Sequence, residues 1–359
     1  MKEVMKLRIQ VSSTVSAYPF YNYRYVQLLR GLASRFRIRI FAASKLPSNF
    51  PGAHENFQVI YVFPFVLPRN IRYRIGPYIS QIYSMAYQSD VILLFEKVTE
   101  PLLLFSRTPI ILDMDDPDFR KLARSGAYKV LNSDKIRKIV VPSELAKKRL
   151  ISLGVAREKL EVIPNGVDLK LFRPQPLPSE EIVLYYGTLT PNRAKLLLES
   201  IRMVCHARPT SKFLVIGDVP RSFIETLKSL KLLNRVKLTG FVPHDLLPSY
   251  LARARVCIFP QENSLGGRLP MKLLDYMASG RPIVATDVDE SWPVKEAGSG
   301  IITPPDPAAF AEAILKLLEN EQLSLKLVRN GIKYVRDFSW EKIIAKYAKL
   351  IEEVFTSAT

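Results

Sequence analysis

Apolar runs alternate with amphipathic runs along almost the whole chain. In residues 21–35, for example, Tyr25, Leu28, Leu29 and Leu32 recur at the spacing of one helix face. The apolar runs have the length of buried strands and lie at residues 6–12, 38–42, 57–63, 90–95, 108–113, 138–142, 160–163, 181–186, 212–217, 235–239, 255–259, 282–286 and 300–302. Such alternation predicts an α/β fold in which parallel sheets are covered by helices on both sides.

A proline-rich segment divides this alternation. Residues 173–179 read RPQPLPS, a composition typical of a linker. The 359 residues are enough for two domains. We therefore expect an N-terminal domain over 1–170, a hinge over 171–180, a second domain over 181–338 and a C-terminal helix over 339–359. Ligands of parallel sheets bind at the carboxyl ends of strands, so the loops there should carry the chemistry.

One such loop reads GGRLPMKLLDYMASG. Its glycine pair, Gly266 and Gly267, precedes a helix expected from Pro270 to about residue 279. Glycines let a ligand approach the backbone closely, and the free N–H groups of a helix N-terminus favour an anion. Lys272 could bind a phosphate and Asp275 a ribose diol. An exposed ion pair between these two residues explains the same spacing equally well.

Charge and composition narrow the class of protein. The net charge is +18, and residues 1–150 carry 24 Lys and Arg against 11 Asp and Glu. This excess favours an anionic partner, although a proteome rich in Lys and Arg would also produce it. The motifs of dinucleotide-binding dehydrogenases, P-loop NTPases and G-x-S-x-G hydrolases are missing, and no Cys or His has metal-ligand spacing. The chain opens on a strand pattern rather than a secretory signal, so we expect a cytoplasmic protein.

Five motifs in order resemble those of the group 1 (family 4) glycosyltransferases of the GT-B fold, along nearly all of the chain. They are VIPNGVD (162–168), YYGTLTPNRAKLLLESI (185–201), VKLTGFVPHDLLPSYLARARVCIFP (236–260), LPMKLLDYMASGRPIVATD (269–287) and DFSWEKIIAKYAKLI (337–351). The resemblance implies two Rossmann-like domains facing across a cleft, with the C-terminal helix returning to the first domain. It also implies a retaining transfer from a UDP- or GDP-sugar to a glycan or lipid-linked acceptor, with no metal or other cofactor. A sugar-nucleotide epimerase and a non-catalytic GT-B-like scaffold are the alternatives.

The resemblance also assigns site residues. Arg193 falls at the position of the family's phosphate-binding lysine, and its neighbour Lys195 could share that role. Phe241 and Val242 lie where the nucleobase is held. The implied donor-binding set is Gly187, Thr188, Phe241, Val242, Glu262, Gly266, Gly267, Lys272, Leu274 and Asp275.

Two departures from the family pattern stand out. Gly267 occupies the position of the first acid of the family's E-x7-E motif, so either sugar recognition differs or Glu262 replaces that acid. In the N-terminal domain, Asp113, Asp115 and Asp116 stand where many members have a histidine. These carboxylates could orient the sugar or the acceptor hydroxyl. The alternative is a helix N-cap cluster before 118–130.

Segment 69–88 combines arginines with tyrosines, a composition suited to a lipid headgroup interface. The residues are Arg69, Arg72, Arg74, Tyr73, Tyr78, Tyr83 and Tyr87. Similar glycosyltransferases often act at the cytoplasmic face of a membrane, so we expect peripheral attachment to an anionic membrane surface at its inner face. The alternative is an ordinary amphipathic helix whose tyrosines face the core. Because no RNA- or DNA-binding motif occurs, nucleic acid is not an expected partner.

Overall fold

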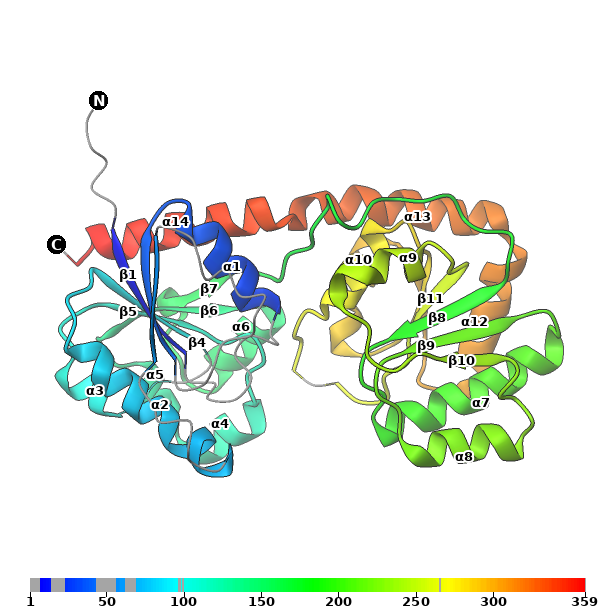
Figure 1. Ribbon diagram of the computed structural model, residues 1–359, viewed down its shortest axis with the longest axis horizontal. Coiled ribbons are helices and arrows are strands. Elements are labelled where there is room, and N and C mark those ends of the chain that lie inside the picture. Colours follow the sequence, from blue (N-terminus) through cyan, green and yellow to red (C-terminus); the bar gives the residue numbers. More distant parts are fainter. Residues whose placement is uncertain are drawn as a thin grey trace. The chain divides into compact units, whose positions relative to one another are not determined.

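A seven-stranded parallel sheet forms the centre of the first unit, which comprises Met1–Asn165 and Trp340–Thr359 (Figure 1). The computed structural model describes residues 7–13, 23–42, 56–61, 69–95, 98, 100–264 and 266–358. The sheet has the order β3-β2-β1-β4-β5-β6-β7, with β1 (Arg8–Ser13), β2 (Arg37–Ala42), β3 (Phe57–Tyr61), β4 (Val91–Phe95), β5 (Ile110–Asp113), β6 (Ile136–Val141) and β7 (Leu160–Val162). The central strand β4, VILLF, is buried at every position because helices cover both faces.

Helices lie on both sides of this sheet, with α1 and α14 on one side and α2 and α3 on the other (Figure 1). They are α1 (Tyr23–Ala33), α2 (Arg69–Met85), α3 (Glu100–Phe105), α4 (Phe119–Ser125), α5 (Tyr128–Leu131), α6 (Glu144–Ser152) and α14 (Trp340–Thr356). The predicted apolar face of α1 is buried. Gly31 allows α14 to approach α1 closely, since a β-carbon there would lie 2.1 Å from Cδ1 of Ile344.

The outer surface of α2 corrects one expectation. Tyr78 and Tyr83 are 49% and 52% exposed, so the alternative in which the tyrosines face the core is wrong for these two residues. Tyr87 follows the helix; it is 40% exposed, and its ring centre lies 5.3 Å from that of the buried Phe41. The side chains of Arg69, Arg72, Tyr73 and Arg74 lie outside the described part of the structure. No helix among the described residues is both long enough and apolar enough to cross a bilayer.

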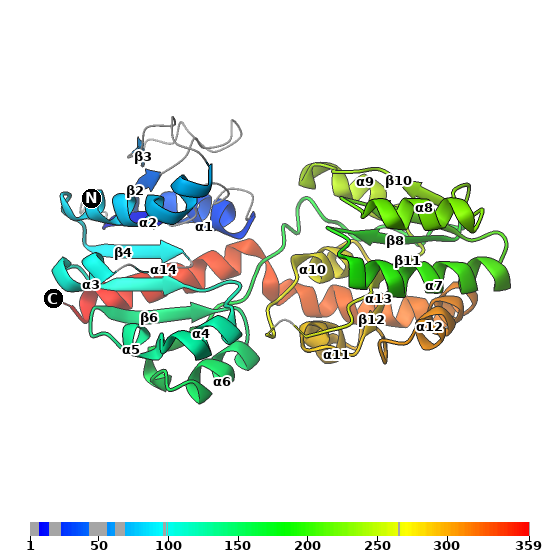
Figure 2. The same ribbon diagram turned by 90° about the horizontal axis from the view of Figure 1, so that it is seen from below.

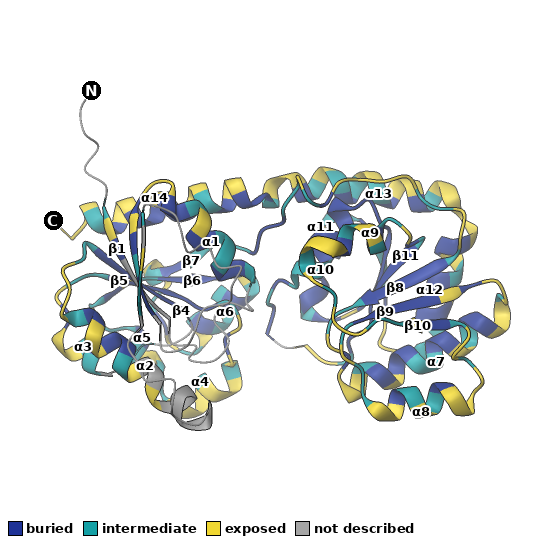
Figure 3. Ribbon diagram, in the orientation of Figure 1, coloured by how far each residue is buried: buried dark blue, intermediate teal, exposed yellow. Residues whose placement is uncertain are grey.

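The second unit, Gly166–Ser339, contains a six-stranded parallel sheet. Its order is β10-β9-β8-β11-β12-β13, with β8 (Ile182–Tyr186), β9 (Lys212–Ile216), β10 (Val236–Leu238), β11 (Val256–Phe259), β12 (Ile283–Thr286) and β13 (Gly300–Thr303). Alternate residues of β8 enter two different apolar clusters: Val183 and Tyr185 one, Leu184 the other. The sheet is therefore buried on both faces, as its dark colour indicates (Figure 3).

The two clusters are closed by different helices. The helices of this unit are α7 (Pro191–Ala207), α8 (Arg221–Ser229), α9 (Leu247–Leu251), α10 (Met271–Ala278), α11 (Trp292–Ala297), α12 (Pro307–Glu319) and α13 (Glu321–Val335), and Figure 2 shows them from a second direction. α7, α8 and α12 pack on one cluster, whereas α9 and α10 pack on the other. All thirteen predicted strands are present, each within two residues of its predicted ends, and the predicted α/β fold is confirmed.

Candidate functional site

The glycine pair lies between the carboxyl end of β11 and the start of α10. Gly266 and Gly267 have φ angles of 120° and 80°, which strongly favour glycine. Pro270 is the N-cap of α10, and Gly280 follows the helix with a φ of 69°. The bounds predicted for this helix are therefore confirmed, and they place Lys272 in its first turn.

Lys272 is held against aromatic side chains at the end of β8. Its Nζ lies 4.8 Å from the ring centre of Tyr185, 5.5 Å from that of Tyr186 and 6.0 Å from that of Phe259. Gly187 follows directly, with a φ of 121°, and a β-carbon at this position would lie 2.3 Å from Nζ. The position of the ammonium group therefore requires glycine at residue 187. Residue 272 as a whole is half-buried, so part of it is open to a ligand, although its ammonium group lies among the rings.

The surroundings of Lys272 disfavour its positive charge. Burial among the rings lowers the pKa of Lys272 to about 7, and the positive charges of Arg193 and Arg268 act in the same direction. Asp275 raises the pKa, but its contribution is the smallest of the four. A bound anion would favour the charged form of Lys272 and raise its pKa again, so the charges of this cluster suit a phosphate group.

Asp275 points into a separate network. It is 1% exposed, accepts a hydrogen bond from the hydroxyl of Tyr186, and lies 3.3 Å from Nε2 of His244. Burial, together with the negative charge of Asp275, raises the pKa of Tyr186 well above its usual value, so the hydroxyl stays a donor. Lys272 and Asp275 therefore do not form the exposed ion pair that their spacing allowed.

Arg193 belongs to the same end of the sheet. It lies in the first turn of α7, and its Nη2 donates to Oε1 of Gln261 at 2.7 Å, while Nη1 donates to the carbonyl of Thr188 at 3.3 Å. Gln261 in turn donates to the buried carboxylate of Glu290. Lys195 is exposed and, two residues further along the helix, does not share a face with Arg193.

The other predicted donor residues differ in their surroundings. Phe241 is 74% exposed, and Val242 is partly buried against the apolar cluster of α9 and α10. Glu262 is partly exposed. Leu274 is fully buried in the core, where its side chain supports α10. The described residues contain no group of three or more His, Cys, Asp or Glu that could hold a metal ion.

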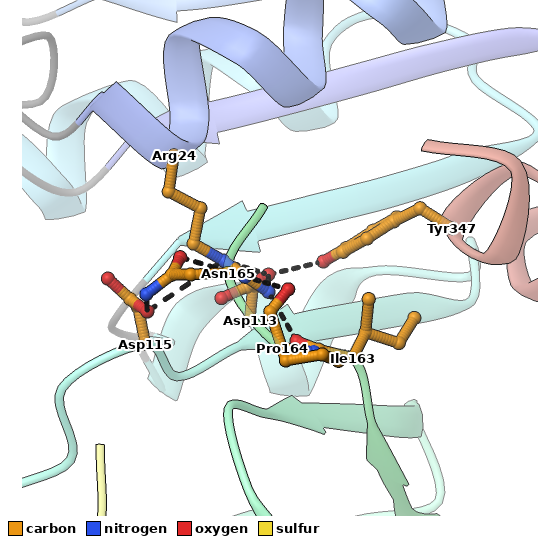
Figure 4. A network of polar contacts seen from close by, with 7 residues as sticks. All are labelled: Arg24, Asp113, Asp115, Ile163, Pro164, Asn165 and Tyr347. Carbon is orange, nitrogen blue, oxygen red and sulfur yellow. Dashed lines mark hydrogen bonds and ion pairs between the residues drawn. The ribbon is translucent and has the colours of Figure 1, made fainter. Parts of the chain in front are cut away.

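In the first unit, Asp113 is the centre of a buried polar network (Figure 4). Its Oδ2 accepts hydrogen bonds from Nη2 of Arg24 at 2.9 Å and from the hydroxyl of Tyr347 at 2.7 Å. Arg24 also donates to the carbonyls of Ile163 and Pro164. Both members of the ion pair are fully buried, and the network joins α1, β5 and α14. Asp113, which the sequence placed among the predicted catalytic residues, therefore also links elements of the first unit.

The neighbouring acids of this loop have different surroundings. Asp115 accepts from Nδ2 of Asn165 at 3.1 Å and lies 3.9 Å from Nε of Arg24, and Asp116 is exposed. The N-cap of α4 is Asp118, which accepts from the N–H of residue 121 at 3.0 Å. The N-cap explanation is therefore wrong for the three predicted acids, whose catalytic role stays a prediction.

Comparison with known proteins identifies the family. The family model described as "Glycosyl transferases group 1" matches residues 180–320, and that described as "Glycosyltransferase Family 4" matches residues 23–171. Together they cover most of both units. The chain is a group 1, family 4 glycosyltransferase.

Relatives of this glycosyltransferase include the alpha-D-kanosaminyltransferase of Streptomyces kanamyceticus, 26% identical over 315 residues, which are 85% of this chain and 75% of the relative. The phosphatidyl-myo-inositol mannosyltransferase of Mycobacterium leprae is 28% identical over 208 residues, 55% of this chain and 54% of that protein. The chain thus spans only about half the length of some curated relatives it matches.

Solved structures share the GT-B fold of this glycosyltransferase. Sucrose-phosphate synthase from Thermosynechococcus elongatus has a TM-score of 0.78 at 20% identity, covering 98% of this chain and 100% of that one. Anabaena HepE in complex with UDP-glucose has a TM-score of 0.74 at 16% identity, with the same coverage of both chains.

Four polar side chains that contact the predicted site residues, or support them, were not predicted from the sequence of this glycosyltransferase. Tyr186, His244, Gln261 and Glu290 all contact or support predicted residues, yet none was assigned a role. A usable signal existed for Gln261, which comes two residues after β11, because the carboxyl ends of parallel strands lie at one edge of the sheet.

Proposed function

We propose that this glycosyltransferase transfers a sugar from a UDP- or GDP-sugar to a glycan or lipid-linked acceptor, with retention of configuration and without a metal ion. The observation that carries the proposal is the cluster of Lys272 and Arg193 beside Gly187, at the carboxyl ends of β8 and β11. Two cationic side chains in the first turns of two helices, α7 and α10, match a diphosphate. The similar HepE structure, described with UDP-glucose bound, supports the same ligand class.

The same cluster suits the departure of the nucleoside diphosphate. As the bond to the sugar breaks, negative charge grows on the leaving phosphate, and fixed positive charges stabilise that state. Lys272 and Arg193 would supply these charges in place of a metal ion. Asp275 stays the predicted ribose ligand. Since its carboxylate is buried behind Tyr186 and His244, ribose binding there requires His244 to move or to donate in its place.

Turnover with defined donors tests this function. Full-length protein is incubated with UDP- and GDP-sugars, with and without a mixture of lipid-linked and glycan acceptors, in the presence of EDTA. A transferase releases nucleoside diphosphate far faster with acceptor, and NMR of the product then gives the anomeric configuration. An epimerase would convert the donor alone, and a non-catalytic scaffold would leave every donor unchanged.

The acceptor side is the second part of the proposal, and α2 and α3 suit an anionic membrane. These helices pack together and expose Tyr78, Ile82, Leu104 and Phe105, the last two at 73% and 72%. Exposed apolar and tyrosine side chains in the strongly basic part of the chain match a negatively charged headgroup region. We therefore propose peripheral attachment through this surface.

Vesicle co-sedimentation tests the attachment. At low salt the protein should pellet with vesicles containing anionic lipid, and less protein should pellet at high salt. Replacing Leu104 and Phe105 by serine should release it, whereas Leu325→Ser, at a 38% exposed leucine of α13, should not. Absence of binding at low salt, or equal release by the control, would rule out this surface.

A further inference from the structure

A carboxylate that belongs to no predicted site lies directly behind the glycine pair. Glu290 is in the short helical turn η3 (Asp289–Ser291), after β12, and is 0% exposed. Its Oε1 accepts from the N–H of Gly267 at 2.9 Å, and its Oε2 accepts from Nε2 of Gln261 at 2.8 Å. Burying a carboxylate is costly unless hydrogen bonds compensate, so both of its oxygens are used to hold neighbours.

Gln261 connects this carboxylate to Arg193. Its Oε1 accepts from Nη2 of Arg193 at 2.7 Å, while its Nε2 donates to Glu290 and to the carbonyl of Asn263 at 3.0 Å. A guanidinium group only donates, whereas carboxylates and carbonyls only accept. The amide of Gln261 therefore has one possible orientation here, and it acts as an adaptor between a cation and an anion.

The backbone of the adaptor is also fixed. The N–H of Gln261 donates to Oγ1 of Thr286 at 2.9 Å, and that hydroxyl donates back to the carbonyl of Gln261 at 2.6 Å. A second tie joins the N–H of Asp289 to Oγ of Ser264 at 2.9 Å. The loop after β11 is thus bound to the segment after β12 on both sides of the Glu290 contacts.

We propose that Glu290 is a positioning acid of the donor site: through Gln261 it orients Arg193, and through the N–H of Gly267 it fixes the glycine pair, ready for a nucleoside diphosphate. The inference rests on the proposed function. For the missing acid at Gly267 the sequence left two alternatives, altered sugar recognition or replacement by Glu262; the structure assigns a supporting role to an acid that follows the next strand. Glu290 acts through its neighbours and does not contact the donor.

This arrangement makes a specific substitution informative. An amide has one carbonyl oxygen, so in Glu290→Gln one of the two donors, Gly267 N–H or the amide of Gln261, loses its acceptor. We expect the dissociation constant for UDP to rise about tenfold, since Arg193 must then be ordered during binding. Gln261→Met removes the link to Arg193 together with the amide donor to Glu290, while the N–H of Gly267 can still donate to Glu290, and it should have a similar effect. Glu290→Asp should retain part of the affinity.

A double-mutant cycle with Arg193→Ala tests the mechanism by titration calorimetry with UDP and GDP on the full chain. If Glu290 acts through Arg193, Glu290→Gln should weaken binding about tenfold in the wild-type background and much less when residue 193 is alanine. Glu296→Gln is the matched control: this carboxylate, on α11, accepts from the hydroxyl of Tyr334 at 2.9 Å, and UDP affinity should not change.

Each outcome decides a different point. Wild-type affinity in Glu290→Gln would overturn the positioning role and leave the proposed function standing. Losses that multiply in the double variant would overturn the route through Gln261 and Arg193, because they would mean that these residues act independently, and would leave only the contact with Gly267. If Glu290→Gln does not fold, the cycle with Gln261→Met is decisive in the same way. A wild-type protein that binds neither UDP nor GDP would refute the proposed function and this role together.

Discussion

The lowered pKa of Lys272 predicts that donor binding is coupled to protonation of Lys272. In the free protein, burial and neighbouring arginines lower the pKa of Lys272 to about 7. A diphosphate beside the ammonium group would favour the charged form and raise this pKa again. If the donor binds at Lys272, we expect binding above pH 7 to take up a proton and the donor's affinity to fall as the pH rises.

The size of the proton uptake and of the change in affinity follows from the pKa of Lys272. With a pKa of about 7, roughly one Lys272 side chain in ten is charged at pH 8. Binding at pH 8 should then take up about 0.9 proton, and affinity should fall about tenfold for each pH unit above 7. Because the pKa of Lys272 in the folded protein lies below the ordinary lysine value of 10.5, the unfolded chain binds more protons between pH 7 and 10.5. The free energy of unfolding of the free protein should therefore rise with pH in that window.

Calorimetry in buffers with different ionisation enthalpies measures this proton uptake. A diphosphate diester such as UDP-glucose is the preferred probe, because it has no phosphate that titrates near neutral pH. Lys272→Met keeps an unbranched side chain only one heavy atom shorter and removes the titrating group, so donor binding by this variant should be weak and should take up no proton. Binding by the wild-type protein that is independent of pH from 7 to 9 would refute the reasoning.

Three further predictions concern single substitutions, two that change stability and one that changes nucleotide binding. Gly31→Ala should lower the free energy of unfolding by about 1–3 kcal/mol in urea, because the new methyl group overlaps Ile344, and Ile344→Ala in the same chain should recover part of the loss. Asp113→Ala removes the nearer of the two carboxylates beside the buried Arg24 and should cost about 3–5 kcal/mol, whereas Tyr347→Phe should cost about 1 kcal/mol. Equal unfolding midpoints for these two variants would contradict the network. Gly187→Ala should abolish UDP binding in calorimetry, since its methyl group would displace Nζ of Lys272; retained affinity would contradict the predicted site.

The strands and the main helix of the site were predictable because they depend on local pattern. Fully apolar runs such as VILLF in β4 identify buried parallel strands without knowledge of their partners. Pro270 and Gly280 mark the two ends of α10 through their own backbone preferences. The family motifs then indicated which of the strand ends carry the site.

The polar partners were not predictable in the same way. Arg24 and Asp113 are 89 residues apart, and Asp113 and Tyr347 are 234 apart, so no local spacing connects them. An acid before a helix is equally consistent with a cap, a catalytic group or a buried ion pair. In the structure Asp113 forms a buried ion pair and Asp118 caps a helix, and the catalytic role of Asp113 stays a prediction. The pattern of a single sequence indicates which face of a helix or strand is buried and where the element ends. Which side chains pair with one another depends on the tertiary fold.

The most direct test of the account is a crystal structure of the full chain with whichever of UDP and GDP binds. The account predicts that phosphate oxygens lie about 2.7–2.9 Å from Nζ of Lys272 and from the guanidinium group of Arg193, with the diphosphate beside Gly187. A nucleotide bound elsewhere, or a diphosphate that contacts neither cation, would contradict the central claim.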